Sequence, residues 1–398
     1  MDTDFSWTRN QFVIPPGMIY LDGNSLGPPL RGTKAALAAL IDEAWGAQLV
    51  DAWNASYWID APSRLGDRIA PIIGAPAGTV LVGETLSVRI FQAVHAALQV
   101  APSGRVILTD MGNFPSDRYI VEGLLRELDG DYRLEVVAPD VVGEHLRDDV
   151  AVLLLTEVDY RTGRRHDVAT LTEKAHAHGA ITVWDLAHSA GAVNVQLERH
   201  QVDFAIGCTY KYLNGGPGAP AFIYARDAHT STASPILQGW LGHSRPFAFE
   251  PTYEPASGIS RFQVGTPPIV AMAALEHALG LWDRVNMVDL ETRRESLCER
   301  FIAGLTKLRH PLRLLTPRDA AARGSHVSIA HTHAYAVVQA LKAEGVIGDF
   351  RMPDIMRFGF APLYNTLEEV DKALERLDQV LRDASWDVPK YHHRNKVT

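Results

Sequence analysis

The stretch Asp203-Phe-Ala-Ile-Gly-Cys-Thr-Tyr-Lys211-Tyr-Leu-Asn-Gly-Gly-Pro-Gly218 decides how the rest of the chain is interpreted. It runs from an apolar segment, typical of a buried strand, through a lysine into a loop rich in glycine. Glycine leaves the backbone N–H groups of a loop uncovered, which suits an anion, and the arm of Lys211 can reach a ligand held there. The stretch therefore indicates a strand that ends at a ligand site.

A second stretch, Ile181-Thr-Val-Trp-Asp185-Leu-Ala-His188-Ser-Ala-Gly, lies shortly before the lysine. Here an apolar strand ends in an aspartate, and a histidine follows. A lysine can carry an imine, and an aspartate on a neighbouring strand can hold a protonated ring nitrogen. Lys211 and Asp185 together supply the minimum that a pyridoxal phosphate (PLP) site requires.

Strands and helices alternate on either side of these stretches. The apolar segments that we expect to be buried strands lie at 80–82, 105–109, 152–156 and 181–185. Helical patterns follow at about 88–99 and 168–178, and this alternation predicts an α/β fold with a mostly parallel, doubly wound sheet. Ligands bind such sheets at the carboxyl ends of the strands. Polar residues at or just past the predicted ends are Ser87, Asp117, Thr156, Asp185 and His188.

The second half of the chain predicts a smaller α/β domain. The pattern is helical from about 269 to 308, and the tail then reads strand, strand, helix, strand, helix. In the last strand Arg357 faces away from its apolar neighbours and lies near Gly359, which leaves room for a carboxylate. Thr366 and Glu369 predict a capping box that begins the last helix. We expect a large domain at 62–272 and a small domain made of 1–61 plus 273–398.

Composition narrows the class of protein. The chain has 398 residues, a formal net charge of -9 and two cysteines, Cys208 and Cys298. A negative charge argues against a nucleic-acid surface, and so few cysteines exclude a disulfide scaffold and fit a reducing cytoplasm. No apolar run reaches the ~18 residues of a membrane span. The stretch 1–7 is acidic and lacks a signal-peptide pattern, so we expect a cytoplasmic protein without a membrane partner.

The chain resembles kynureninase, a PLP enzyme family of aminotransferase-like fold type I, over nearly its whole length. The stretches that carry the resemblance are Tyr-Leu-Asp-Gly-Asn-Ser-Leu-Gly (20–27), Asn-Phe-Pro-Ser-Asp (113–117), Trp-Asp-Leu-Ala-His-Ser-Ala-Gly (184–191), Gly-Cys-Thr-Tyr-Lys-Tyr-Leu-Asn-Gly-Gly-Pro-Gly (207–218), Gly-Trp-Leu-Gly-His (239–243) and Met-Arg-Phe-Gly-Phe (356–360). The resemblance implies hydrolytic cleavage of the Cβ–Cγ bond of L-kynurenine to anthranilate and L-alanine in tryptophan catabolism. The resemblance leaves open whether the 3-hydroxy form is a second substrate.

The resemblance also implies a role for each matching residue. Lys211 would bind PLP as an imine, Asp185 would pair with its ring nitrogen, and Tyr210 would contact the phosphate and move protons. Phe114 would stack on the ring. The other residues implied to contact the cofactor are Leu86, Ser87, Ser116, Asp117, Thr156 and His188.

The substrate and a second subunit complete the implied site. Arg357 would bind the α-carboxylate, and Asn24 and Trp58 would lie near the substrate, Trp58 being typical of the bacterial type that prefers kynurenine. Trp240 and Thr266 would reach the cofactor phosphate of the neighbouring subunit, so the resemblance implies a homodimer. No metal site is expected.

Two alternatives stay open at this point. One is another fold-type-I activity, such as an aminotransferase or a cysteine desulfurase, but a desulfurase requires a cysteine on a mobile loop. Cys208 is predicted on a buried strand and Cys298 in a helix. The other is a PLP-binding regulator or a catalytically silent protein. It would carry a basic DNA-binding segment, or it would lack Lys211, Asp185 or Arg357, and this chain retains all three.

Overall fold

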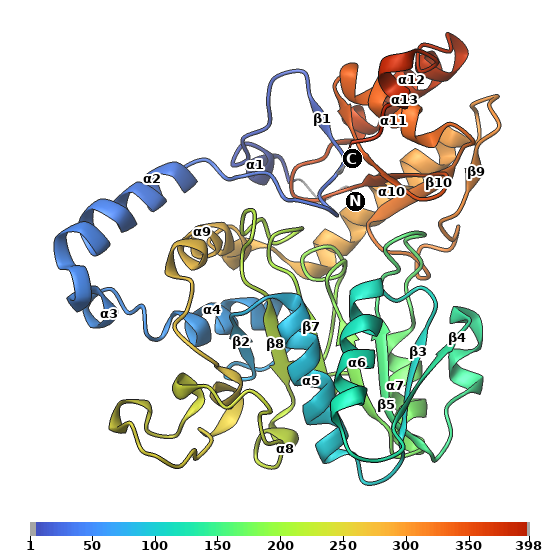
Figure 1. The fold of residues 1–398 in the computed structure, drawn as a ribbon. Helices are drawn as coiled ribbons and strands as arrows, with labels where there is room; N and C mark the ends of the chain where they lie inside the picture. The colour runs from blue at the N-terminus through green and yellow to red at the C-terminus, as the bar shows by residue number, and fades with distance from the viewer. Residues whose placement is uncertain (1–4, 396–398) are drawn as a thin grey trace.

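A seven-stranded sheet forms the centre of the larger part of the protein (Figure 1). The computed structural model describes residues 5–395, so residues 1–4 of the acidic stretch at 1–7 lie outside it. The strand order is β2-β8-β7-β6-β5-β3-β4. The strands are β2 (Val80–Val82), β3 (Val106–Asp110), β4 (Arg133–Val137), β5 (Val150–Thr156), β6 (Ile181–Asp185), β7 (Phe204–Gly207) and β8 (Phe222–Ala225).

The run from β4 to β7 is parallel, and β8 pairs antiparallel with both β7 and β2. The prediction of a mostly parallel sheet is therefore confirmed. Strand β5 is buried along its whole length, as expected of a central parallel strand that is covered on both faces. Strand β4 was not predicted, because its partly exposed side chains lack the continuous apolar run of the central strands.

Helices cover both faces of this sheet. Helices α5 (Leu86–Val100) and α6 (Pro115–Glu127) share one apolar core with β-strand residues such as Ile107 and Val152. Helices α4 (Ala61–Ile69) and α7 (Val168–Ala177) share a second core with residues such as Leu108. Successive side chains of a strand point to opposite faces, so the two cores lie on the two sides of one sheet.

The smaller part is built on a four-stranded antiparallel sheet in the order β12-β13-β10-β9. Its strands are β9 (Arg313–Leu314), β10 (His326–Ala330), β12 (Asp349–Arg351) and β13 (Ile355–Gly359). Its helices are α10 (Met287–Leu305), α11 (Ala334–Ala343), α12 (Leu367–Arg382) and α13 (Pro389–His392). Thr366 and Glu369 form the predicted capping box at the start of α12. The helical stretch predicted at 269–308 is two helices, because α9 (Ile269–Leu279) ends before α10 begins.

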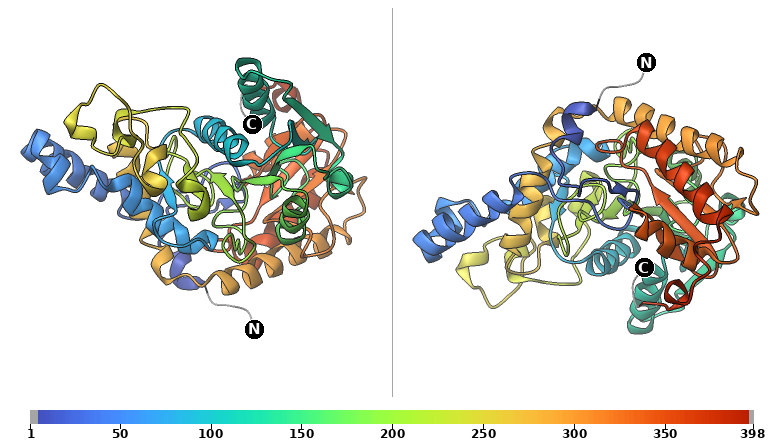
Figure 2. Two further views of the ribbon diagram at one scale, coloured as in Figure 1. Left: turned by 90° about the horizontal axis from the view of Figure 1, so that it is seen from below. Right: turned by 90° about the horizontal axis from the view of Figure 1, so that it is seen from above.

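The N-terminal segment joins the two parts. After α1 (Ser6–Arg9), strand β1 (Ile19–Tyr20) pairs with β11 (Val346–Ile347), more than 300 residues away in the sequence. The segment after Arg31 forms α2 (Thr33–Ala39), followed by π-helical turns at Leu40–Gly46. With α3 (Ala52–Ala55), it forms an arm that extends away from the body of the molecule in every view (Figures 1 and 2). Within residues 5–395, no helix combines the length and the apolar character that a membrane crossing requires.

Candidate active site

The carboxyl ends of β5 and β6 bring two of the predicted residues together. Thr156 and Asp185 are directly opposite each other in the parallel register, and the Thr156 hydroxyl lies 3.1 Å from Asp185 Oδ2. The backbone N–H of Ala187 donates to Asp185 Oδ1 at 2.8 Å. Asp185 is 2% exposed, and this burial raises its pKa, against the opposing effect of the nearby Lys211 charge. The site thus holds a carboxylate with a fixed orientation at the end of the sheet.

Lys211 follows β7 and lies at the same edge of the sheet. Its Nζ donates to Nε2 of His188 at 3.0 Å. Burial lowers the pKa of Lys211, so its neutral, nucleophilic amine is more accessible than that of a surface lysine. Burial, followed by the Lys211 charge, holds the pKa of His188 well below its usual range, so its ring is neutral and Nε2 can accept.

Asp117 is a second buried carboxylate at this edge. It lies in the first turn of α6 and is 0% exposed, and neither of its oxygens has a hydrogen-bond partner among the described residues. Burial and then the charge of Asp185 raise its pKa well above the usual range. A buried carboxyl group without a partner is costly unless a ligand supplies one. The pair Asp117 and Asp185 therefore marks a place where a polar or cationic group binds.

Two helix N-termini meet beside these carboxylates. Leu86 and Ser87 begin α5, Ser116 lies in the first turn of α6, and the two serine hydroxyls are 3.2 Å apart. No side chain caps either helix start, which leaves N–H groups for an anion such as a phosphate. Phe114, at the N-cap of α6, is 44% exposed and touches Tyr160 edge-on, with 5.0 Å between the ring centroids. An uncovered ring, an anion cradle and an unpartnered buried carboxyl group fit a flat anionic cofactor such as PLP.

A second group of predicted residues comes from the smaller part and the N-terminal segment. Arg357 on β13 is 1% exposed, and Asn24 is 1% exposed with neither amide atom hydrogen-bonded to a described residue. Asn24 packs where Gly359 has no side chain, since a Cβ there would lie 1.8 Å from Asn24 Oδ1. The room that we expected beside Arg357 is occupied, because the carboxylate of Asp349 binds its guanidinium.

Tyr210 lies at the same edge as Lys211, whose Nζ is 5.8 Å from the Tyr210 ring centroid. Burial raises the pKa of the Tyr210 hydroxyl, so it remains protonated and can donate.

His326 was not predicted from the sequence. Its ring is fully buried, lies 5.5 Å from the His188 ring between centroids, and has neither nitrogen hydrogen-bonded to a described residue. A histidine within an apolar strand carries no signal in the sequence that separates it from a core residue.

A third group lies together on the arm and the loop that faces it. Trp58 packs edge-on against Trp53, and both line one cavity together with Thr266. A second, larger cavity shares Trp53 and Thr266 with it but not Trp58. The larger cavity measures about 550 Å³, and Trp240, which is 41% exposed, forms part of its wall. Trp58 and Trp240 thus line adjoining cavities that have Trp53 and Thr266 in common.

Comparison with known proteins gives relatives in sequence and, separately, solved structures of similar fold. The family description "Kynureninase C-terminal domain" matches residues 290–377. The kynureninase of Pseudomonas fluorescens is 46% identical, with 98% of this chain and 95% of that protein covered. The kynureninase of Burkholderia pseudomallei (strain K96243) is 44% identical at the same coverage.

Solved structures resemble the chain in fold alone. A complex of the cystine C-S lyase C-DES with cysteine persulfide has a TM-score of 0.79 at 21% identity, covering 91% of this chain and 98% of that one. A cysteine desulfurase from Escherichia coli has a TM-score of 0.78 at 18% identity, covering 96% and 99%. Another structure of C-DES contains glycine covalently linked to the PLP cofactor of that enzyme.

Proposed function

The chain belongs to the kynureninase family, and from that premise we propose how its residues carry out hydrolysis of the Cβ–Cγ bond of L-kynurenine. The products are anthranilate and L-alanine, and the cofactor is PLP. The observation that best supports this proposal is the Lys211 amine, which lies 3.0 Å from His188 and whose charge acts on the buried carboxyl groups of Asp117 and Asp185.

We assign the cofactor to the polar and aromatic residues that meet at the carboxyl edge of the large sheet. Lys211 would hold it covalently, Asp185 would accept from its ring N–H, and Phe114 would cover its ring. The N-termini of α5 and α6, with Ser87 and Ser116, would bind its phosphate. The remaining proposed contacts are Leu86, Asp117, Thr156, His188 and Tyr210. PLP when bound withdraws electrons from the bonds of the substrate α-carbon.

The other steps belong to side chains of this protein. Arg357 binds the α-carboxylate of the substrate, with Asn24 beside it, and so fixes which bond of the α-carbon is oriented for cleavage. Lys211 would remove the α-proton of the bound substrate and would return a proton to the α-carbon as L-alanine forms. Water adds to the γ-carbonyl, and collapse of the hydrated carbonyl breaks Cβ–Cγ. We assign the proton transfers at the γ-carbonyl and Cβ to the hydroxyl of Tyr210.

We also propose that two copies of the chain form a homodimer with shared sites. Trp58, Trp240 and Thr266 would complete the site of the partner copy. The surface around them leaves large apolar side chains uncovered, Val50 at 74% and Phe249 at 75%, and extended apolar surface of this kind marks an interface. Val50→Asp should give monomers in light scattering, whereas a dimer of unchanged stability would contradict this part of the proposal.

The desulfurase alternative suggested by the fold is disfavoured by the cysteines. Cys208 and Cys298 are both buried and free. Burial raises the pKa of both thiols, that of Cys298 to about 11. A sulfur-transfer enzyme requires an accessible thiolate, and neither residue supplies one. Two reduced cysteines also fit the cytoplasm that we propose as the compartment.

The reaction is tested by mixing the PLP-loaded protein with L-kynurenine and measuring anthranilate by fluorescence and alanine by mass spectrometry. Lys211→Ala should form neither product, whereas Lys174→Ala, which removes an exposed lysine of α7, should retain full activity. Absence of products from both L-kynurenine and its 3-hydroxy form would refute the proposed reaction. Normal turnover by Lys211→Ala would refute the role of the lysine.

A further inference from the structure

We propose that Asp349 is the positioning residue of Arg357. It holds one edge of the guanidinium, so that the opposite end of the group, whose present acceptors are neutral, is presented to the α-carboxylate of the substrate. This inference rests on the proposed function, which assigns the carboxylate to Arg357, and adds the residue that orients it.

The sheet register places the two side chains together. Strands β12 and β13 are antiparallel, and Asp349 is directly opposite Arg357. Arg357 Nε donates to Asp349 Oδ1 at 2.7 Å, and Nη2 donates to Oδ2. Asp349 is 2% exposed and Arg357 1%. A bidentate pair in this geometry fixes the plane of the guanidinium as well as its position.

The hydrogen-bond partners of Arg357 show which edge remains available. A guanidinium has five N–H donors. Asp349 uses the edge formed by Nε and Nη2. At the opposite end, Nη1 donates to the backbone carbonyl of Tyr160, and Nη2 lies 3.3 Å from the Ser25 hydroxyl. These two acceptors are neutral, so a substrate carboxylate can replace them with stronger, charge-assisted bonds.

The charged groups around Asp349 leave an excess of positive charge at this site, which favours binding of an anion. Besides Arg357, Asp349 binds Nη2 of Arg351 at 2.9 Å, and it accepts from the Ser25 hydroxyl at 2.7 Å. Two arginines thus share one carboxylate. Burial and then the charge of Asp349 raise the pKa of Asp22 to about 7, so this neighbouring carboxyl group does not neutralise the remaining positive charge below that pH.

The competing interpretation is that the pair only links β12 to β13. The two interpretations predict different ligand dependence. A link between strands affects stability and every ligand alike, whereas a positioning residue affects ligands that carry the α-carboxylate. L-Alanine carries that group, whereas 2-aminoacetophenone carries the aminoaryl ketone and no carboxylate.

The experiment measures the dissociation constants of both ligands by isothermal titration calorimetry on the PLP-loaded protein. Asp349→Asn preserves the shape of the side chain and removes its charge. It should weaken L-alanine binding by about tenfold or more and change 2-aminoacetophenone binding by less than about twofold. Asp349→Glu, which restores the charge, should recover part of the affinity for L-alanine. Asp354→Asn, in the turn between β12 and β13, is the matched control and should change neither constant.

Equal weakening of both ligands, or unchanged L-alanine binding, would overturn the proposal, as would a wild-type protein that does not bind L-alanine. If Asp349→Asn does not fold, Ser25→Ala serves as the second variant, because it removes one hydrogen-bond donor to the Asp349 carboxylate. Ser25→Ala should weaken L-alanine binding severalfold. Unchanged L-alanine binding in Ser25→Ala would also overturn the proposal. A wild-type protein that binds L-alanine but does not cleave L-kynurenine refutes the proposed reaction alone, and the comparison of ligands still decides the role of Asp349.

Discussion

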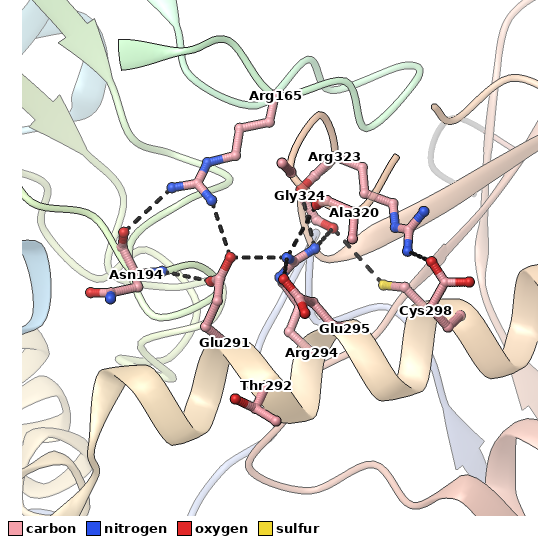
Figure 3. Close-up of polar contacts among 12 residues, drawn as sticks. Arg165, Asn194, Glu291, Thr292, Arg294, Glu295, Cys298, Ala320, Arg323 and Gly324 are labelled. Atoms are coloured by element: carbon pink, nitrogen blue, oxygen red, sulfur yellow. Dashed lines mark hydrogen bonds and ion pairs between the residues drawn. The ribbon is translucent and has the colours of Figure 1, made fainter. Parts of the chain in front are cut away.

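Replacing Glu291 with glutamine is expected to destabilise the contact between helix α10 and the large sheet. Figure 3 shows Glu291 at the centre of a polar network on this helix. Its carboxylate accepts from Arg165 Nη1 at 3.1 Å and from Arg294 Nη2 at 2.9 Å, while the backbone N–H of Asn194 donates to it at 2.8 Å. Arg165 and Asn194 belong to the segments after β5 and β6, so one side chain joins the two parts of the molecule.

The size of the effect follows from these contacts. A hydrogen bond to a charged group stabilises a protein by about 1.5–3 kcal/mol. Glutamine retains one acceptor oxygen, so we take the loss as one to two such bonds, about 1.5–6 kcal/mol. Glu291 is 20% exposed and Arg165 18%, and solvent screening moves the expected loss to the lower end, about 2 kcal/mol.

Glu295→Gln is the matched control. Glu295 lies on the same helix and binds the same Nη2 of Arg294, at 3.1 Å, but it is 44% exposed. Its replacement should cost less than about 1 kcal/mol. Urea denaturation followed by circular dichroism gives both values, and hydrogen exchange of α10 shows whether the loss is local. Equal losses in the two variants would refute the reasoning that burial of Glu291 makes its hydrogen bonds the stronger ones.

Three further predictions concern other buried groups. Burial acts to raise the pKa of Asp203, but hydrogen bonds from two histidines, at 2.8 and 2.7 Å, outweigh it and hold that pKa below its usual range. The stability that this pKa shift contributes is present above about pH 4 and is lost as the pH falls. Asp203→Asn should therefore flatten the acid limb of a plot of Tm against pH. An unchanged acid limb would contradict this. The pKa of Asp22 is raised to about 7, chiefly by burial, so between about pH 4 and about pH 7 the folded protein keeps a proton that the unfolded chain has lost, and stability falls as the pH rises. The Tm of Asp22→Asn relative to the wild type should therefore rise across that window and level off above it, and a constant difference would contradict this. Gly359→Ala places a Cβ 1.8 Å from Asn24 Oδ1 and should raise the KM for L-kynurenine in steady-state assays. An unchanged KM would contradict the proposal that Asn24 lies at the substrate site.

The part of the site that lies on consecutive strands could be predicted from the sequence. Thr156 and Asp185 end strands whose apolar runs are continuous, and the rule that ligands bind at carboxyl ends then places both residues at one edge. The start of α12 was predictable for a similar reason, because a capping box is a local signal.

The remainder depends on pairing between distant segments, which no local pattern encodes. Asp349 was not predicted, since its importance comes from lying opposite Arg357 in the sheet register. Asn24 lies against Gly359 through a contact between residues more than 300 positions apart. The edge strand β4 escaped prediction because exposed side chains interrupt its apolar pattern.

The pairing of β1 with β11 has a consequence for the order in which the protein folds. Ile19 lies beside Val346, and Asp22 bridges Gly359, so β1 has no strand partner until nearly the whole chain has left the ribosome. Contacts between residues so distant in sequence form slowly. The central sheet, whose strands lie between Val80 and Ala225, can form earlier, because domains assemble as their residues emerge during synthesis. We therefore expect nascent chains stalled before residue 346 to contain the ordered sheet and to lack the packing of Asn24 against Gly359.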